Sequence, residues 1–194
     1  MTKSIKENEA KIIMFTYKID DLSYLSLLEI QDADKLYNLI NRNREHIGEW
    51  LKFPSMTLKV EDSQAFIERT RISYAKEEGY WLGIWNEDQL VGSIGYLYID
   101  KENKKTEIGY WLGKEYEGKG LITKSVIELI NHAFDKYKLN KIEIGAAREN
   151  RRSRAIPEKL GFKQEGELRD YEYIQGRNLN RIIYGLKASE WRSK

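Results

Sequence analysis

The sequence contains no cysteine among its 194 residues. Disulfide bonds, zinc–thiolate sites and a cysteine nucleophile are therefore excluded. Histidine is nearly absent too, because His46 and His132 are the only two and lie far apart in the chain. A histidine-based metal site or a Ser-His-Asp triad would have to use one of them. His132 falls within an apolar helical pattern, where we expect it to pack, and no metal site is expected.

Long apolar runs are also missing. No stretch approaches the roughly 20 apolar residues that a membrane-spanning helix needs. Residues 1–13 are charged and polar and contain no apolar signal region. We expect them to form a loosely held N-terminal tail ahead of a single domain at residues 14–194. The protein is expected to be cytoplasmic and to have no membrane partner.

Neither sign of charge dominates the chain. Lysine and arginine number 33, aspartate and glutamate 31, and the net charge is +2. This balance gives no electrostatic footprint for direct nucleic-acid binding, which we do not expect. A hydrophobic content of 41% can supply the core of one sizeable domain.

The most informative stretch is residues 107–123, where a strand, a glycine-rich turn and a helix follow one another. Ile108, Tyr110 and Leu112 alternate along the predicted strand. The turn carries three glycines, Gly113, Gly118 and Gly120. Free N–H groups at the start of a helix, together with its positive dipole end, make an anion site. An ordinary strand–loop–helix connection would show the same pattern, because a short glycine-spaced loop is a weak signal.

The remaining elements follow from periodicity and from turn residues. Strands are predicted at 22–28, 80–85, 89–99, 141–147, 168–174 and 180–186, and helices at 61–78 and 122–137. Ile72 and Ala75 are expected on the inward face of the helix at 61–78. Ser153 is expected to cap a helix that Gly161 ends. The predicted strands form hairpins in the first part of the chain and a β-α-β unit in the later part. This order predicts an α/β (α+β) fold, with a mixed, mostly antiparallel sheet of about six to seven strands and helices on both faces.

This order of elements resembles the GNAT acetyltransferase superfamily, and within it the Rim-type branch that includes ribosomal-protein N-terminal acetyltransferases. Ile-Gly-Tyr-Trp-Leu runs into Glu-Gly-Lys-Gly-Leu-Ile-Thr, and Asn150-x-x-Ser153 precedes Glu-Lys-Leu-Gly-Phe. The C-terminal hairpin at 171–177 is the third feature that carries the resemblance. The resemblance covers residues 14–192. At the loop the family pattern often begins with glutamine or arginine, where this chain has Glu115.

The resemblance implies that acetyl-CoA is the cosubstrate. Its binding residues would be Trp111, Leu112, Glu117, Gly118, Lys119, Gly120, Leu121, Ile122, Thr123, Asn150 and Ser153. Backbone N–H groups at 117–123 would hold the pyrophosphate, with Lys119 neutralising it from the side. The strand edge at Trp111 and Leu112 would pair with pantetheine amides, and Asn150 would also contact pantetheine. The carboxylates of Glu115 and Glu117 should point away from phosphate.

Transfer to an amine needs a proton acceptor, for which a carboxylate is suited. The resemblance places Glu172 on the strand that faces the acceptor, and Glu107 is the second candidate. A solvated hairpin position and a cross-strand ion pair are their respective structural alternatives. Tyr171 would lie on the face opposite Glu172 in a regular strand. Ser153 could protonate the leaving thiolate, although helix capping alone would explain a serine there.

The implied function is transfer of acetyl to a primary amine, foremost the N-terminal amine of a ribosomal protein. A small acceptor, such as a polyamine, an antibiotic or an amino-acid-like amine, and a non-catalytic acyl-CoA-binding module are the alternatives. The aromatic segment at 47–53 either walls a pocket or packs on the core. Tyr184 and Trp191, taken as exposed, suggest a homodimer.

Overall fold

The computed structural model describes residues 16–192, in which eight β-strands form one sheet. The tail expected at residues 1–13 lies outside the described residues. The strands are β1 (Thr16–Lys18), β2 (Ser23–Leu27), β3 (Tyr80–Asn86), β4 (Gln89–Asp100), β5 (Lys105–Leu112), β6 (Lys141–Ala147), β7 (Lys163–Ile174) and β8 (Arg177–Lys187). The α-helices are α1 (Ala33–Arg42), α2 (Arg44–Gly48), α3 (Val60–Lys76), α4 (Leu121–Asp135), α5 (Arg151–Leu160) and α6 (Ala188–Arg192). Three short 3₁₀ turns are η1 (Ile30–Asp32), η2 (Phe53–Ser55) and η3 (Lys114–Tyr116).

The sheet runs in the order β1-β2-β3-β4-β5-β6-β8-β7. All neighbouring strands are antiparallel except β5 and β6, which are parallel. This confirms the mixed, mostly antiparallel sheet that the sequence predicts. The observed strands exceed the expected six to seven, because the three-residue β1 adds an edge that no local pattern reveals.

The parallel pair is short. The register of β5 with β6 runs only from Lys105–Lys141 to Glu107–Glu143 in the part of the chain described. Yet β5 continues to Leu112 and β6 to Ala147. The two strands therefore part near the middle of the sheet.

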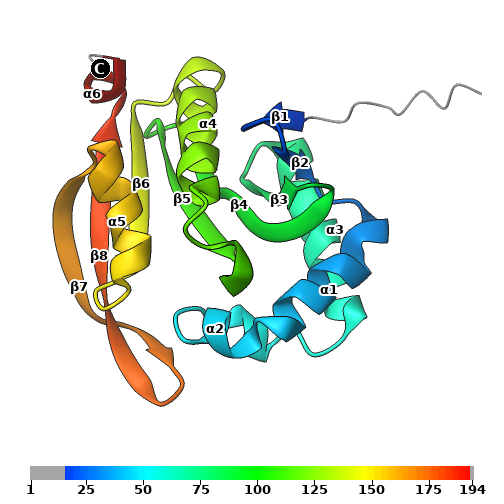
Figure 1. The fold of residues 1–194 in the computed structure, drawn as a ribbon. Helices are drawn as coiled ribbons and strands as arrows, with labels where there is room; N and C mark the ends of the chain where they lie inside the picture. Colours follow the sequence, from blue (N-terminus) through cyan, green and yellow to red (C-terminus); the bar gives the residue numbers. More distant parts are fainter. Residues whose placement is uncertain (1–15, 193–194) are drawn as a thin grey trace, which may run out of the picture.

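Apolar clusters cover both faces of the sheet, as expected. On one face, Tyr80, Leu82 and Ile84 of β3 pack with the apolar side of α4 and with Leu160 of α5. On the other face, Trp85 and Trp111 pack against α1, α2 and α3. Alternation along the strands produces this division, since successive side chains point to opposite faces. Figure 1 shows α4 and α5 lying over β5, β6 and β8.

The inward face of α3 differs from the expectation. Ile72 is 56% exposed and Ala75 is exposed, whereas Ser63, Ile67 and Thr70 are buried. Thr70 Oγ1 accepts a hydrogen bond from the Trp81 backbone N–H at 2.6 Å. This bond to the end of the sheet, which the apolar pattern does not encode, turns the threonine side of the helix inward.

The capping of α5 also differs from the expectation. Asn150 is the N-cap residue, and its side-chain oxygen accepts the Ser153 backbone N–H at 3.1 Å. Ser153 therefore lies inside the first helical turn and is not the cap. Gly161 ends the helix in the left-handed conformation, with φ of 80°, as predicted.

Aromatic residues near the C-terminus do not form an exposed patch. Tyr184 is buried and its hydroxyl donates to Glu158 at 2.6 Å. Trp191 is half-buried against the core, and its indole N–H donates to Asn131 at 2.8 Å. The homodimer suggested from these two residues stays a prediction that has lost this support.

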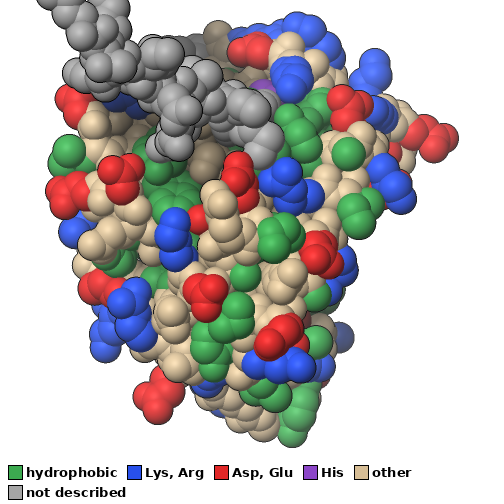
Figure 2. Space-filling view, turned by 90° about the vertical axis from the view of Figure 1, so that its right-hand side faces the viewer, with side chains coloured by type: hydrophobic (Ala, Val, Ile, Leu, Met, Phe, Trp, Pro, Cys, Tyr) green, Lys and Arg blue, Asp and Glu red, His purple; other side chains and the backbone are tan. Residues whose placement is uncertain are grey.

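The surface carries both signs of charge. On the face shown in Figure 2, acidic and basic side chains are interspersed. Within residues 16–192, no helix combines the length and apolar character needed to cross a membrane.

His132 of α4 is buried among tyrosines, in agreement with the packing role expected for it. Its Nδ1 lies 3.3 Å from the Tyr80 hydroxyl and 3.4 Å from the Tyr96 hydroxyl. The Tyr96 hydroxyl also approaches the Leu129 carbonyl oxygen, to which it donates at 2.6 Å. Burial lowers the pKa of His132 from its usual 6.5 to about 4, and Lys136 adds to this effect. The imidazole is therefore neutral in the folded protein at physiological pH.

The first prediction concerns stability against pH. The unfolded chain binds a proton at His132 below pH 6.5, whereas the folded protein resists it until about pH 4. The free energy of unfolding should fall by an amount on the order of 2 kcal/mol as the pH drops from 6.5 towards 4. Urea titrations of wild type and His132→Gln over this range measure it. Equal pH dependence in both proteins would contradict the assignment.

The second prediction separates the two residues at the start of α5. Asn150→Ala should lower the free energy of unfolding by about 1 kcal/mol, because it removes the cap. Ser153→Ala should change it by less than about 0.5 kcal/mol. Chemical denaturation of both variants is the measurement, and a larger loss in Ser153→Ala would show that the serine is the cap.

Candidate functional site

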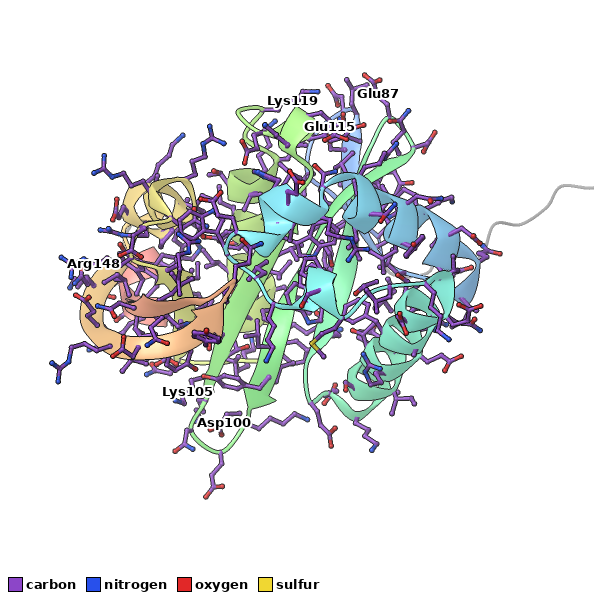
Figure 3. All side chains as sticks on the ribbon, turned by 90° about the horizontal axis from the view of Figure 1, so that it is seen from below. Glu87, Asp100, Lys105, Glu115, Lys119 and Arg148 are labelled. Carbon is purple, nitrogen blue, oxygen red and sulfur yellow. The ribbon has the colours of Figure 1, made fainter. Side chains whose placement is uncertain are left out.

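A cleft of about 1600 Å³ opens where β5 and β6 part. Its walls come from both faces of the sheet. Tyr110, Leu112 and the first turns of α4 and α5 line it, and so do Trp50, Phe53 and Trp81 from the segments of the opposite face. Seen from below, the β7–β8 hairpin and α5 lie on one side of β5, and α1 and α3 on the other (Figure 3). The cleft is therefore lined by residues from both faces of the sheet.

On the edge of β5 that faces the cleft, backbone N–H and C=O groups are available to hydrogen-bond a ligand. Gly113 donates its backbone N–H to Val91 at 2.8 Å, on the β4 side. Neighbouring residues of an antiparallel ladder point their N–H and C=O groups to opposite edges. The Leu112 backbone groups therefore face β6, which has already diverged. This edge can accept an extended ligand as an added strand.

The glycine turn leads into α4 as predicted. Gly118 and Gly120 have φ of 77° and 75°, the left-handed conformation that favours glycine. Open space surrounds the position of a Cβ at either residue. Gly118, Gly120, Leu121, Ile122 and Thr123 all line the cleft. The N-terminus of α4 thus presents backbone N–H groups to open space, which is the arrangement that binds anions.

The charged side chains of this turn point in different directions. The Glu117 carboxylate contacts His46 Nε2 at 3.1 Å and also pairs with Arg152 of α5. The carboxylate is therefore engaged by Arg152 and His46 and is not free to face a ligand, in line with the expectation that it points away from phosphate. His46 and Arg152 were missed by sequence reasoning, since nothing local pairs residues so far apart.

Lys119 does not reach the cleft. Its amine lies 4.9 Å from the centre of the Tyr116 ring, and it lines a separate small pocket of about 390 Å³ with Glu87. Figure 3 shows Lys119, Glu87 and Glu115 at one edge of the molecule. Among the described residues, Lys119 is therefore not one of the cleft-lining side chains, and its expected role beside phosphate stays a prediction.

Asn150, Ser153 and Tyr110 meet on the cleft wall. The Tyr110 hydroxyl donates to the Ser153 carbonyl oxygen at 2.9 Å, and Ser153 Oγ lies 3.3 Å from that hydroxyl. Burial raises the pKa of the Tyr110 phenol, which stays neutral. Asn150 uses its side-chain oxygen on the helix cap, so its amide N–H₂ is the part left to face a ligand.

Both candidate carboxylates pair with the same residue, Arg181 of β8. Its guanidinium bonds Glu107 and lies 3.4 Å from Glu172 Oε1. Glu172 is 35% exposed and lines the cleft, whereas Glu107, 18% exposed, is not among the described residues that line it. Geometry therefore favours Glu172 as the group that meets a ligand.

Tyr171 does not lie opposite Glu172 as a regular strand would require. Its ring lies 5.0 Å from the Arg181 guanidinium. The register of β7 with β8 shifts between Leu168 and Glu172, and Asp170 has a positive φ of 49°. This bulge rotates the strand, so the period-two argument fails there.

Aromatic side chains wall the half of the cleft on the α1–α3 side. Phe53 and Trp111 lie 5.6 Å apart between ring centres, and Phe66 and Trp81 lie 6.4 Å apart. Ile47, Trp50 and Phe53 of the 47–53 segment all line the cleft, and Ile47 also belongs to the core cluster on this face, against which Phe53 packs. The segment therefore both walls the pocket and packs on the core. Within residues 16–192, no group of three His, Asp or Glu side chains is arranged to hold a metal ion.

Comparison with known proteins agrees with this geometry. The acetyltransferase (GNAT) domain family matches residues 24–163. A Bacillus subtilis (strain 168) protein named "Putative ribosomal N-acetyltransferase YdaF" is 38% identical over 92% of this chain and 98% of its own length. The Escherichia coli (strain K12) ribosomal-protein-serine acetyltransferase is 27% identical over 82% of this chain and 89% of its own.

A solved structure supports the same assignment. The microcin C7 self immunity acetyltransferase MccE, in complex with acetyl-CoA and AMP, has a TM-score of 0.84 and 30% identity to this chain. The match covers 88% of this chain and 94% of that one. The family match, the relatives and the parted strands lead to one conclusion: the chain belongs to the GNAT family of acetyltransferases and is an acyltransferase.

Proposed function

We propose that the protein transfers acetyl from acetyl-CoA to a primary amine, foremost the N-terminal amine of a ribosomal protein. The observation that carries the proposal is the cleft itself, in which an open strand edge at Leu112 adjoins the N-terminus of α4. An open edge suits the amides of pantetheine, and free helical N–H groups suit a pyrophosphate. Both ends of one cosubstrate thus find partners in one cleft.

The residues present fit acetyl-CoA. Backbone N–H groups of 118–123 and the Thr123 hydroxyl would take the pyrophosphate, since all of these residues except Lys119 line the cleft. Glu117 would contribute its backbone only, because its carboxylate is engaged by His46 and Arg152. The edge at Trp111 and Leu112 and the Asn150 amide would hold pantetheine. The side-chain amine of Lys119 has no part in this proposal.

Three groups would carry the chemistry. Acetyl-CoA supplies the acetyl group as a thioester. Glu172 would take a proton from the amine, directly or through water, so that the nitrogen can attack the thioester carbonyl carbon. The Leu112 N–H would stabilise negative charge on the carbonyl oxygen. The Ser153 hydroxyl would turn from Tyr110 towards the leaving sulfur, pass it a proton and take one back from solvent.

The acceptor is proposed from two kinds of support. Relatives at 38% and 27% identity carry names that refer to ribosomal acetylation. The cleft volume of about 1600 Å³ exceeds the ~300–1,000 Å³ usual for small-molecule pockets, which leaves room for the end of a polypeptide chain. Such an acceptor would place the enzyme in the cytoplasm.

A small amine is the second candidate acceptor. The aromatic rings of Trp50, Phe53 and Trp81 line the acceptor half and could stack on a planar group. MccE, at 30% identity, has been solved with AMP bound. An amine attached to a nucleotide is therefore the form of small acceptor to test first, with polyamines and aminoglycosides beside it.

An acceptor screen distinguishes these proposals. The purified protein and acetyl-CoA are incubated separately with N-terminal peptides of ribosomal proteins, aminoacyl nucleotide analogues, polyamines and aminoglycosides, and products are identified by mass spectrometry. We expect one acetyl group on the α-amine of a ribosomal peptide. Transfer only to a small amine would replace the acceptor, and acetyl-CoA binding without any transfer would identify a non-catalytic module.

The third prediction tests the glycine turn. Gly120→Glu should weaken acetyl-CoA binding at least about tenfold, because a carboxylate would enter the open space at the start of α4. Gly120→Asn is the matched control, since it shares the backbone strain of a positive φ without the charge. Isothermal titration calorimetry measures both. Unchanged affinity in folded Gly120→Glu would show that phosphate binds elsewhere.

The fourth prediction tests the base. Glu172→Gln should lower kcat by about 100-fold, because removing a general base typically costs that much. The dissociation constant for acetyl-CoA should change by less than about twofold, since Glu172 lies on the acceptor side. Steady-state kinetics and calorimetry give the two numbers. Wild-type turnover in this variant would exclude Glu172 as base.

A further inference from the structure

Arg181 makes a long reach across the sheet. It lies opposite Ala147 in the register of β8 with β6. Its guanidinium nevertheless bonds Glu107 on β5, the strand beyond β6. The side chain therefore crosses β6, and it does so where β5 and β6 begin to part, since Glu107–Glu143 is the last pair of their described register.

Gly145 makes the crossing geometrically feasible. A Cβ built on Gly145 would overlap Nε and the guanidinium carbon of Arg181. The arginine thus lies flat on the glycine backbone of β6. Any larger residue at 145 would lift the guanidinium away from Glu107. Gly145 of β6 and Arg181 of β8 are therefore a matched pair across two neighbouring strands.

Four sides of the guanidinium are engaged. Glu107 and Glu172 take its N–H groups, the Tyr171 ring lies 5.0 Å away, and Gly145 lies beneath. The Arg181 side chain is only 15% exposed. Such multiple engagement fixes an arginine, whose planar fork can serve two carboxylates at once. Glu107 is the more deeply placed partner and acts as the anchor.

We propose that Arg181 is the positioning residue of the acceptor site: anchored by Glu107 and resting on Gly145, it aims the Glu172 carboxylate into the cleft. The inference rests on the proposed function, in which Glu172 receives the amine proton. Arg181 also balances one of the two carboxylates, which leaves the cluster with a net charge of −1. That charge attracts an incoming ammonium group to the end of the cleft where its proton is removed.

The test separates positioning from simple charge pairing. Removing Arg181 alone would leave the half-buried Glu107 without this partner, so the informative variant is Glu107→Gln combined with Arg181→Gln. This double variant should remain folded and bind acetyl-CoA within about twofold of wild type. Its kcat should fall about 100-fold, because a small misplacement of a catalytic group can cost that much. Wild-type kcat in the double variant would show that Arg181 only neutralises Glu107, and would overturn the inference.

Gly145→Ala gives a second, independent measurement. It keeps every charged group but lifts Arg181 from β6, and we expect kcat to fall at least about tenfold with unchanged acetyl-CoA affinity. Gly166→Ala is the matched control, because a Cβ there would meet open space. A kcat for Gly145→Ala equal to that of the control would overturn the inference.

Two further readings sharpen the result. The single variant Arg181→Lys should have a kcat well below that of wild type, because a lysine cannot bond two carboxylates in a fixed plane. A wild-type kcat in this variant would overturn the inference. Turnover by the wild-type protein in the same assay reports on the proposed function, whereas the ratio of variant to wild-type kcat reports on Arg181. The two failures are therefore distinct.

Discussion

The structure depends on the point where a parallel strand pair stops pairing. β5 and β6 share a described register only from Lys105–Lys141 to Glu107–Glu143, and both strands then continue apart. Backbone N–H and C=O groups need partners when they are removed from water. A gap in the middle of a sheet therefore persists only where solvent or a ligand can satisfy those groups. The cleft, the open edge at Leu112 and the placement of α4 all follow from this divergence.

The gap also gives the site two sides. The first turns of α4 and α5 meet it from one face, and the aromatic segment around Trp50 and Phe53 meets it from the other. In the proposed function the cosubstrate occupies the first side and the amine the second, so the two meet in the plane of the sheet. Arg181 lies across β6 where the two strands part. Its side chain contacts both Glu107 at the start of the gap and Glu172, and so links the position of Glu172 to the gap.

Local patterns in the sequence predict much of this arrangement. The strand, glycine turn and helix at 107–123 are correct because alternation, left-handed glycines and helical periodicity are all local signals. The role of Ser153 as cap is wrong because Asn150, three residues earlier, accepts the Ser153 backbone N–H and starts the helix. The orientation of Tyr171 is wrong because a bulge interrupts the period of two. The Lys119 amine lies 4.9 Å from the centre of the Tyr116 ring, a contact that a local pattern does not predict. Arg181 could not be placed from local pattern, since its partner Glu107 lies 74 residues away. Its one signal was a charge preceding Ile182 and Ile183 in a strand, which requires a partner when buried.

On this geometry, acetyl-CoA should bind in the gap between β5 and β6. A crystal structure of the protein grown with acetyl-CoA would show whether it does. We predict the pyrophosphate on the backbone N–H groups of 118–123 and the pantetheine amides on the edge of β5 at Trp111 and Leu112, with the acetyl group towards Glu172. Acetyl-CoA bound anywhere outside this gap would contradict the account.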